Sequence, residues 1–362
     1  NFNRYNESGG PNAAARAVAT RAFYEEHADD YDFLFFFSLF DYEMQDALAF
    51  HMAVSNDVQG IGKSQFDNTN AYGSDGRLLG TVDMGTAILN EAKTDPTSEK
   101  HQQLLTTTMH EMLHQWGIFV DFIDPATGER SDQLLGHQDA HWSPLVDTSG
   151  SVEYGAKWVD NGDGTFTAVA ERQFYSPLDL YLMGMVGKDE VPPFYVIENP
   201  DPAIDPEAVS VGGRTVSGQR KELTVEAIIA AEGPRQPSFQ NAQKSFNAAF
   251  IVVKRPGQDV PPEVYGRVND LRETAAQRFS ILTGGRGLLH VHSRVRPLGS
   301  TGEADPASGE TDEREGEYVR GDALDWLRQA QSAGHWQDTS ATAVRDSLLV
   351  DAVLRDLDPL YD

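Results

Sequence analysis

The chain contains no cysteine among its 362 residues. Disulfide bonds, thiolate metal sites and cysteine nucleophiles are therefore excluded, and histidine, aspartate and glutamate remain as the strong metal ligands. Long apolar runs are also missing, since none approaches the roughly 20 residues that a membrane-spanning helix needs. We therefore expect no membrane span, and any metal site must use nitrogen and oxygen ligands.

Positive charge is scarce. The chain has 29 Lys and Arg against 56 Asp and Glu, which gives a formal net charge of −27 at pH 7. A field of this sign repels nucleic acids and anionic membrane surfaces, so we expect neither as a partner. The acidity serves solubility, and it also suits saline or harsh surroundings. The sequence predicts no particular oligomeric state, and the start at Asn1 suggests a processed product.

The hydrophobic pattern predicts an α+β protein. The apolar run at 33–40 is rich in phenylalanine and long enough for a central strand covered on both faces, although a buried helix could have the same composition. Helical patterns occupy 12–27, 176–184, 225–232 and 261–283, and strand patterns occupy 51–54, 80–85 and 248–253. Residues 158–166 are typical of a hairpin with its tip at Asn161–Gly164.

The stretch TMHEMLHQWG at 108–117 contains HExxH, extended to HExxHxxG. His110 and His114 stand at i and i+4, so on a helix they lie on one face and can bind the same metal ion. Glu111 sits one position round the helix, where it can reach a metal-bound water as a general base without ligating the metal. This combination indicates metal-assisted hydrolysis.

Both ends of the helix that carries this motif have suitable residues. Asp95 is a good N-cap and Pro96 fits the first helical position. Gly117 suits a left-handed stop at the C-terminal end. We therefore predict a helix from Pro96 to Gly117.

Catalytic zinc needs one more protein ligand than this helix offers. In the compact metzincin motif a third histidine follows the glycine, but here Val120 stands at that position. Asp121, one residue later, is a possible ligand that is out of phase with the motif. His141, followed by Trp142, is the preferred third ligand. Asp179 (or another carboxylate) and His137 remain alternatives.

The motif followed later by a His-Trp pair resembles the leishmanolysin-like branch of the metzincins, in which an insertion separates the glycine from the third histidine. The resemblance covers about residues 30–185 and implies a zincin-like mixed sheet, an active-site helix and an antiparallel edge strand. Residues 80–85 would be that edge strand and would pair with an extended peptide. Glu153 stands where the family has the methionine of its Met-turn, so Met183 is an alternative floor under the metal.

Two further sets of residues are candidates for a role. Tyr154 is the preferred side chain for hydrogen bonding to a tetrahedral oxyanion, with Tyr175 and Tyr181 as alternatives. Asp160 and Asp163 suggest a calcium loop, but the later bidentate glutamate of such a loop is missing.

The C-terminal part has a different composition. We expect a zincin-like domain at 1–299, an acidic linker at 300–317 and a helical hairpin at 318–362. The hairpin contains QxxGxW at 331–336, which is similar to a single QW repeat of α/α toroids. One repeat cannot close a toroid, so an ordinary helical hairpin is the alternative interpretation.

These features lead to one main hypothesis, a secreted or cell-envelope zinc-dependent endopeptidase acting on a protein or peptide substrate. His110, His114 and His141 would hold the metal and Glu111 would be the general base. One alternative is a surface binding or assembly protein that uses a zincin scaffold with weak or lost catalysis. Another is a metal hydrolase acting on a non-peptide ester or amide.

Overall fold

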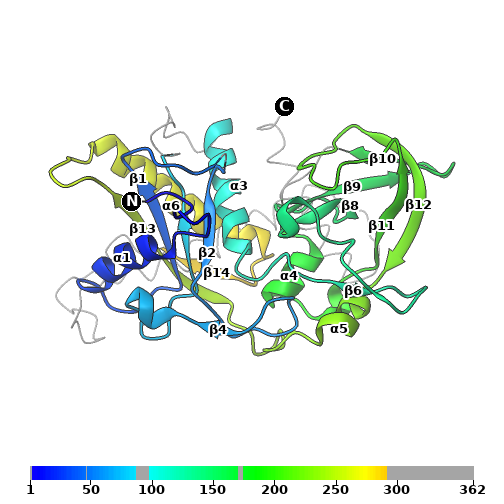
Figure 1. The fold of residues 1–362 in the computed structure, drawn as a ribbon, viewed down its shortest axis with the longest axis horizontal. Coiled ribbons are helices and arrows are strands. Elements are labelled where there is room, and N and C mark those ends of the chain that lie inside the picture. The colour runs from blue at the N-terminus through cyan, green and yellow to red at the C-terminus, as the bar shows by residue number, and fades with distance from the viewer. Residues whose placement is uncertain (1, 46, 87–97, 170–173, 292–362) are drawn as a thin grey trace, which may run out of the picture.

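The computed structural model describes residues 2–45, 47–86, 98–169 and 174–291. A five-stranded mixed sheet forms the body of one half of the molecule (Figure 1). Its strands are β1 (Phe33–Ser38), β2 (Phe50–Ala53), β5 (Gly80–Asp83), β13 (Ser245–Val253) and β14 (Leu288–His290). They lie in the order β14-β13-β1-β5-β2, and all neighbours are parallel except β2, which is antiparallel to β5.

Strand β1 confirms the prediction of a covered central strand, because all its residues are buried and it pairs with β13 and β5. Its side chains alternate between two hydrophobic clusters, as the pleat of a strand requires. Phe33, Phe35 and Phe37 belong to the cluster on one face, and Leu34 and Phe36 to the cluster on the other. The phenylalanine run therefore makes this strand the wall between two cores.

Helices cover both faces of the sheet. They are α1 (Ala13–Tyr24), α3 (Glu99–Leu113) and α6 (Pro262–Leu282). Helix α1 contributes Ala17 and Tyr24 to the cluster around Leu34, whereas α3 and α6 pack on the opposite face. Helix α6 confirms the predicted amphipathic pattern, since the residues spaced to face the core are all buried: Val264, Val268, Leu271, Ala275 and Phe279.

The predicted position of the edge strand is wrong. Strand β5, in the segment 80–85, lies inside the sheet with all four of its residues buried and with partners on both sides. Strand β2 is the antiparallel edge instead, with Phe50 paired to Asp83 and Ala53 to Gly80. The family resemblance implied an edge strand but not which segment forms it, and hydrophobic patterning reports burial rather than pairing, so it does not distinguish these two short strands.

A small closed barrel forms the other half of the molecule, with α3 between it and the sheet (Figure 1). Its strands are β8 (Trp142–Asp147), β9 (Tyr154–Asp160), β10 (Thr165–Val169), β11 (Phe194–Asp201) and β12 (Thr215–Leu223). The predicted hairpin is confirmed, because β9 and β10 are antiparallel neighbours with Phe166 opposite Asp160. Strands β8 and β9 are parallel neighbours, with Trp142 paired to Tyr154, so both strands start at the same end of the barrel.

The remaining elements are short. Helices α4 (Pro177–Met183) and α5 (Val225–Glu232) match the predicted ranges, and Gly184 ends α4 in the left-handed conformation with a φ of 80°. Short strands β3 (Ser55–Asn56) and β4 (Phe66–Asp67) form one pair, and β6 (Phe122–Ile123) and β7 (Arg130–Ser131) another. Three single turns of 3₁₀ helix complete the description: η1 (Thr69–Tyr72), η2 (His137–Asp139) and η3 (Lys188–Glu190).

The chain is thus an α+β protein, as predicted. Within the described ranges, no helix is both long and apolar enough to cross a bilayer. The predicted linker at 300–317, the hairpin at 318–362 with its QW-like motif, and the domain boundary at 299 all lie outside the described residues.

Candidate metal centre

Helix α3 carries the HExxH motif and ends inside it. The helix starts at Glu99 rather than at Pro96, because Ser98 takes the N-cap position and its side chain accepts a hydrogen bond from the His101 amide. Asp95 and Pro96, the predicted start, lie outside the described residues. His114 is the C-cap, and Gly117 is not among the residues with positive φ, so the predicted left-handed stop at Gly117 is wrong.

The other half of the site comes from the barrel. His141 immediately precedes β8 and Glu153 immediately precedes β9. Because these strands are parallel and pair Trp142 with Tyr154, the two preceding residues are neighbours as well. The Trp142 amide donates to the Glu153 carbonyl over 2.9 Å, which fixes the two chains at this point. The barrel therefore brings His141 and Glu153 together opposite the end of α3.

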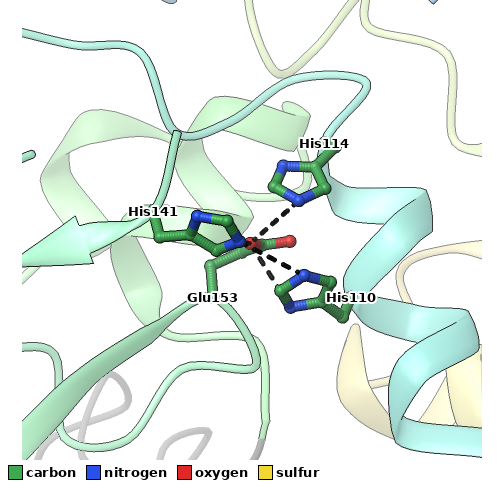
Figure 2. A group of neighbouring side chains, drawn as sticks. All are labelled: His110, His114, His141 and Glu153. Carbon is green, nitrogen blue, oxygen red and sulfur yellow. Dashed lines mark hydrogen bonds and ion pairs between the residues drawn. The ribbon is translucent and has the colours of Figure 1, made fainter. Parts of the chain in front are cut away.

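Figure 2 shows the imidazoles of His110, His114 and His141 and the carboxylate of Glu153 converging on one point. One ligand atom from each residue can be chosen so that all lie within 4.8 Å of one another. The Nε2 atoms of His110 and His141 are 3.3 Å apart. Oε2 of Glu153 lies 3.5 Å from Nε2 of His114 and 3.6 Å from Nε2 of His141. This buried group could hold a metal ion.

These separations fit a small metal ion. Ligands at the corners of a tetrahedron, each about 2.0–2.2 Å from a zinc ion, are about 3.3–3.6 Å from one another. The three separations given above fall in this range. These three separations therefore suit a tetrahedral ion, and they do not identify the metal.

Backbone carbonyls hold the far side of each imidazole. Nδ1 of His110 is 2.7 Å from the Val152 carbonyl, and Nδ1 of His141 is 2.7 Å from the His137 carbonyl. Nδ1 of His114 is 3.4 Å from the Gly117 carbonyl. A carbonyl can only accept, so each Nδ1 carries the proton and each Nε2 keeps its lone pair for a metal.

Burial keeps these imidazoles neutral. The pKa of His110 falls from 6.5 to about 4 and that of His141 to about 3, mainly because of burial and with a contribution from neighbouring histidines. The pKa of His114 also falls well below its usual value, mainly because of burial and then because of His110. Metal binding requires the neutral form of histidine, so the site is already in the right protonation state.

Glu153 is the most unusual member of the group. Its side chain is 0 % exposed, and neither of its carboxylate oxygens has a hydrogen-bond partner. Burial raises its pKa well above the usual value, and the charges of Glu111 and Asp179 raise it further. A buried carboxyl group without hydrogen bonds is costly unless it is protonated or binds a cation.

Glu111 lies beside the group but is not one of its members. Its side chain is 6 % exposed, and burial raises its pKa to about 8 although the His51 backbone amide donates a hydrogen bond to it. A pKa near neutrality is the property that a residue needs to accept and return a proton. The structure thus shows Glu111 buried near Glu153, and its role as a base stays a prediction.

Tyr154 also lies at the site. Its ring stacks on the His141 ring with centroids 4.5 Å apart and an interplanar angle of 16°. The residue has a φ of 70°, which is uncommon for an aromatic side chain. Burial, followed by the charges of Glu153 and Glu111, raises its pKa to about 12, so the hydroxyl stays protonated and able to donate.

The alternative oxyanion residues have other contacts. The Tyr175 hydroxyl donates to the Met109 carbonyl, and the Tyr181 hydroxyl accepts from the Arg235 amide. Both hydroxyls are therefore hydrogen-bonded to the backbone of other segments.

The alternatives to His141 as third ligand have contacts of their own. Asp121 accepts a hydrogen bond from Arg130, and Nδ1 of His137 lies 3.2 Å from Glu207. Met183, the alternative floor, is buried in the main core, and its role under the metal stays a prediction.

Asp179 has a supporting position rather than a ligating one. It is fully buried and accepts hydrogen bonds from the Trp142 indole over 2.8 Å, the Ser151 hydroxyl over 2.6 Å and the Ser176 amide over 2.7 Å. The Ser151 oxygen in turn accepts from the Glu153 amide over 2.9 Å. One carboxylate therefore ties together the residue after His141, the turn before Glu153 and the start of α4.

The hairpin suggested as a calcium loop uses its carboxylates locally. Asp160 accepts from the Gly162 amide, and Asp163 accepts from both the amide and the hydroxyl of Thr165. The described part of the chain contains no group of three or more candidate ligands at this hairpin. These aspartates stabilise the turn.

The sequence contained a signal for Glu153 that was not interpreted as such. A carboxylate stands where the resembling family has a methionine, twelve residues after His141.

Comparison of the chain with protein-family models, curated proteins and solved structures yields no match. Inferences about function therefore depend on the site itself.

Proposed function

We propose that the chain is a zinc-dependent endopeptidase of the zincin type. The observation that carries the proposal is the geometry of the three histidines. Their Nε2 atoms converge while backbone carbonyls occupy each Nδ1, and the motif glutamate is buried beside them. His110, His114 and His141 would hold the ion, with Glu153 next to them.

A zinc ion, when bound, would supply a Lewis acid and lower the pKa of a water molecule to about 7. The protein residues would handle the proton. Glu111 would accept it on a carboxylate oxygen and return it to the leaving amine. The buried setting that raises the pKa of Glu111 to about 8 supports both directions of transfer near neutral pH. The Tyr154 hydroxyl would donate to the oxygen that becomes negative.

The position of β2 suggests how a peptide would lie. His51 on this edge strand donates its backbone amide to Glu111, so the strand runs beside the base. An extended peptide pairing with β2 would pass the candidate centre, which favours a peptide over a compact ester substrate. The secreted or cell-envelope location expected from the family resemblance remains a prediction.

Glu111→Gln tests the proposal. The amide keeps the size of the side chain but cannot accept the proton, so peptide hydrolysis should fall by about 10²–10⁴-fold. Metal content, measured by mass spectrometry of the purified protein, should stay unchanged. Glu99→Gln is the matched control, because Glu99 lies in the exposed first turn of the same helix. Hydrolysis that is equal in wild type and Glu111→Gln would contradict the proposal.

A second function is favoured by the position of Glu153. Four protein ligands around one ion are typical of structural sites, whereas catalytic sites keep one position open. A binding or assembly protein stabilised by the ion would have the same group of residues. A peptide library incubated with the metal-loaded protein distinguishes the two functions, since the binding protein would bind metal and leave every peptide intact.

A further inference from the structure

The charge of Glu153 has no protein partner that could neutralise it. The closest ionisable groups are the three imidazoles, and both carboxylate oxygens lack hydrogen bonds. The nearby carboxylates Glu111 and Asp179 add charge of the same sign. A buried carboxyl group of this kind is either protonated or neutralised by a cation among its neighbours.

The position of Glu153 is fixed on both sides of the residue. The Glu153 amide donates to Ser151, which is itself held by Asp179, and the Glu153 carbonyl accepts from Trp142. The preceding carbonyl, that of Val152, accepts from His110. The same short turn thus orients one ligand imidazole and presents the carboxylate, so its geometry is coupled to the metal centre.

The separations indicate which position the carboxylate takes. Its Oε2 atom is 3.5 Å and 3.6 Å from the Nε2 atoms of His114 and His141, while the Nε2 atoms of His110 and His141 are 3.3 Å apart. Nitrogen–oxygen and nitrogen–nitrogen separations are thus similar, as expected for equivalent corners of a tetrahedron with edges of about 3.3–3.6 Å. Oε2 also lies 3.4 Å from Nδ1 of His110, but that N–H donates to the Val152 carbonyl over 2.7 Å, so it makes no hydrogen bond to the carboxylate.

We propose that Glu153 is the fourth protein ligand and closes the metal centre in its resting state. The inference rests on the proposed metal site and gives it a specific consequence. An exogenous ligand can enter only when Glu153 leaves or when the coordination number rises to five. The mixed set of imidazoles and one carboxylate also accepts Co²⁺ or Mn²⁺ besides zinc.

Cobalt-loaded protein allows a direct test, because the visible spectrum of Co²⁺ changes with the number and type of its ligands. The variants are Glu153→Gln and Glu153→Ala. Glu207→Gln is the matched control, since Glu207 is an exposed glutamate that contacts His137 close to the site. Both Glu153 variants should change the cobalt spectrum, and Glu153→Ala should weaken the Co²⁺ Kd by more than the roughly 10–100-fold that loss of an outer-shell partner causes. Azide should bind Glu153→Ala at least tenfold more tightly than wild type.

Thermal unfolding of the metal-free protein is a second measurement, which shows whether a Glu153 variant still folds. Removing an unpartnered buried carboxylate should leave the metal-free protein as stable as wild type or more stable, whereas the gain in Tm on adding Co²⁺ should shrink. An unchanged cobalt spectrum and Kd in Glu153→Ala would overturn the role of Glu153. A wild-type protein that binds no Co²⁺ or Zn²⁺ would instead overturn the metal site, so the two failures differ.

Discussion

The effect of Asp179→Asn on stability can be predicted, because two opposing contributions to the free energy of unfolding can be estimated. Burial raises its pKa from 3.8 to about 6, so keeping it ionised at pH 7.5 costs about 3 kcal/mol of stability. Asp179→Asn removes that cost. The amide group, however, points a donor at a position where the structure has donors from Trp142, Ser151 and Ser176, and losing one charge-assisted hydrogen bond costs about 1.5–3 kcal/mol.

The two effects nearly cancel in stability but not in metal binding. We expect the free energy of unfolding of the metal-free protein to change by less than about 2 kcal/mol. The Zn²⁺ Kd should rise by about 10–100-fold, since the turn that presents Glu153 and the Val152 carbonyl loses its support. Urea unfolding gives the first quantity, and competition with a chromophoric chelator gives the second.

Asp147→Asn is a matched control, because Asp147 is a partly buried carboxylate with a raised pKa, at the far end of β8. It should leave the Zn²⁺ Kd unchanged. If Asp179→Asn lowers stability by several kcal/mol while the Zn²⁺ Kd stays within twofold of wild type, Asp179 supports packing and does not position the metal centre.

Two further predictions concern pH and buried charge. Because metal ligands must be deprotonated, affinity rises with pH, and the lowered pKa values of His110 and His141 remove the histidines from this competition above about pH 5. Between pH 5 and 7 only carboxylates would still release protons when the metal binds, so the logarithm of the Zn²⁺ association constant should rise by no more than two per pH unit. Glu153→Gln should lower this slope by about one. A measured slope of three would contradict the prediction. Separately, Arg16→Met should lower the free energy of unfolding by about 3–5 kcal/mol, because Arg16 is fully buried against the buried Asp83 carboxylate. Adding Asp83→Asn should restore most of that loss in urea unfolding, and a double variant no more stable than the single one would contradict this explanation.

Local patterns predicted the parts of the fold that local physics determines. The phenylalanine run became β1, the spacing of Val264 to Phe279 became the buried face of α6, and Ser176 and Gly184 delimit α4. In each case composition, periodicity or a capping residue decides the outcome within a few positions.

Pairings between distant segments could not be predicted in this way. In helix α1 the apolar Val18 is 60 % exposed, whereas the charged Arg16 is buried. Arg16 is buried because it pairs with Asp83, which the fold brings next to it from a distant strand. The exchange of β5 and β2 between inner and edge positions has the same origin, since strand neighbours are set by the whole sheet.

The same distinction between local patterns and distant pairings applies to the candidate site. His110, Glu111 and His114 are fixed by one helix, so their mutual geometry followed from spacing alone. His141 was selected through a family resemblance, and the structure brings it to the other two. The role of Glu153 depends on the parallel pairing of β8 with β9 and on the hydrogen bonds of Asp179, none of which leaves a periodic signal in the sequence.

The central claim is that His110, His114 and His141 bind one metal ion. A crystal of zinc-loaded protein measured on both sides of the zinc absorption edge tests it most directly. We predict one anomalous peak within about 2.0–2.2 Å of the Nε2 atoms of all three histidines, with a Glu153 oxygen at the fourth position. The absence of a peak there, or a zinc ion that contacts none of these imidazoles, would contradict the claim.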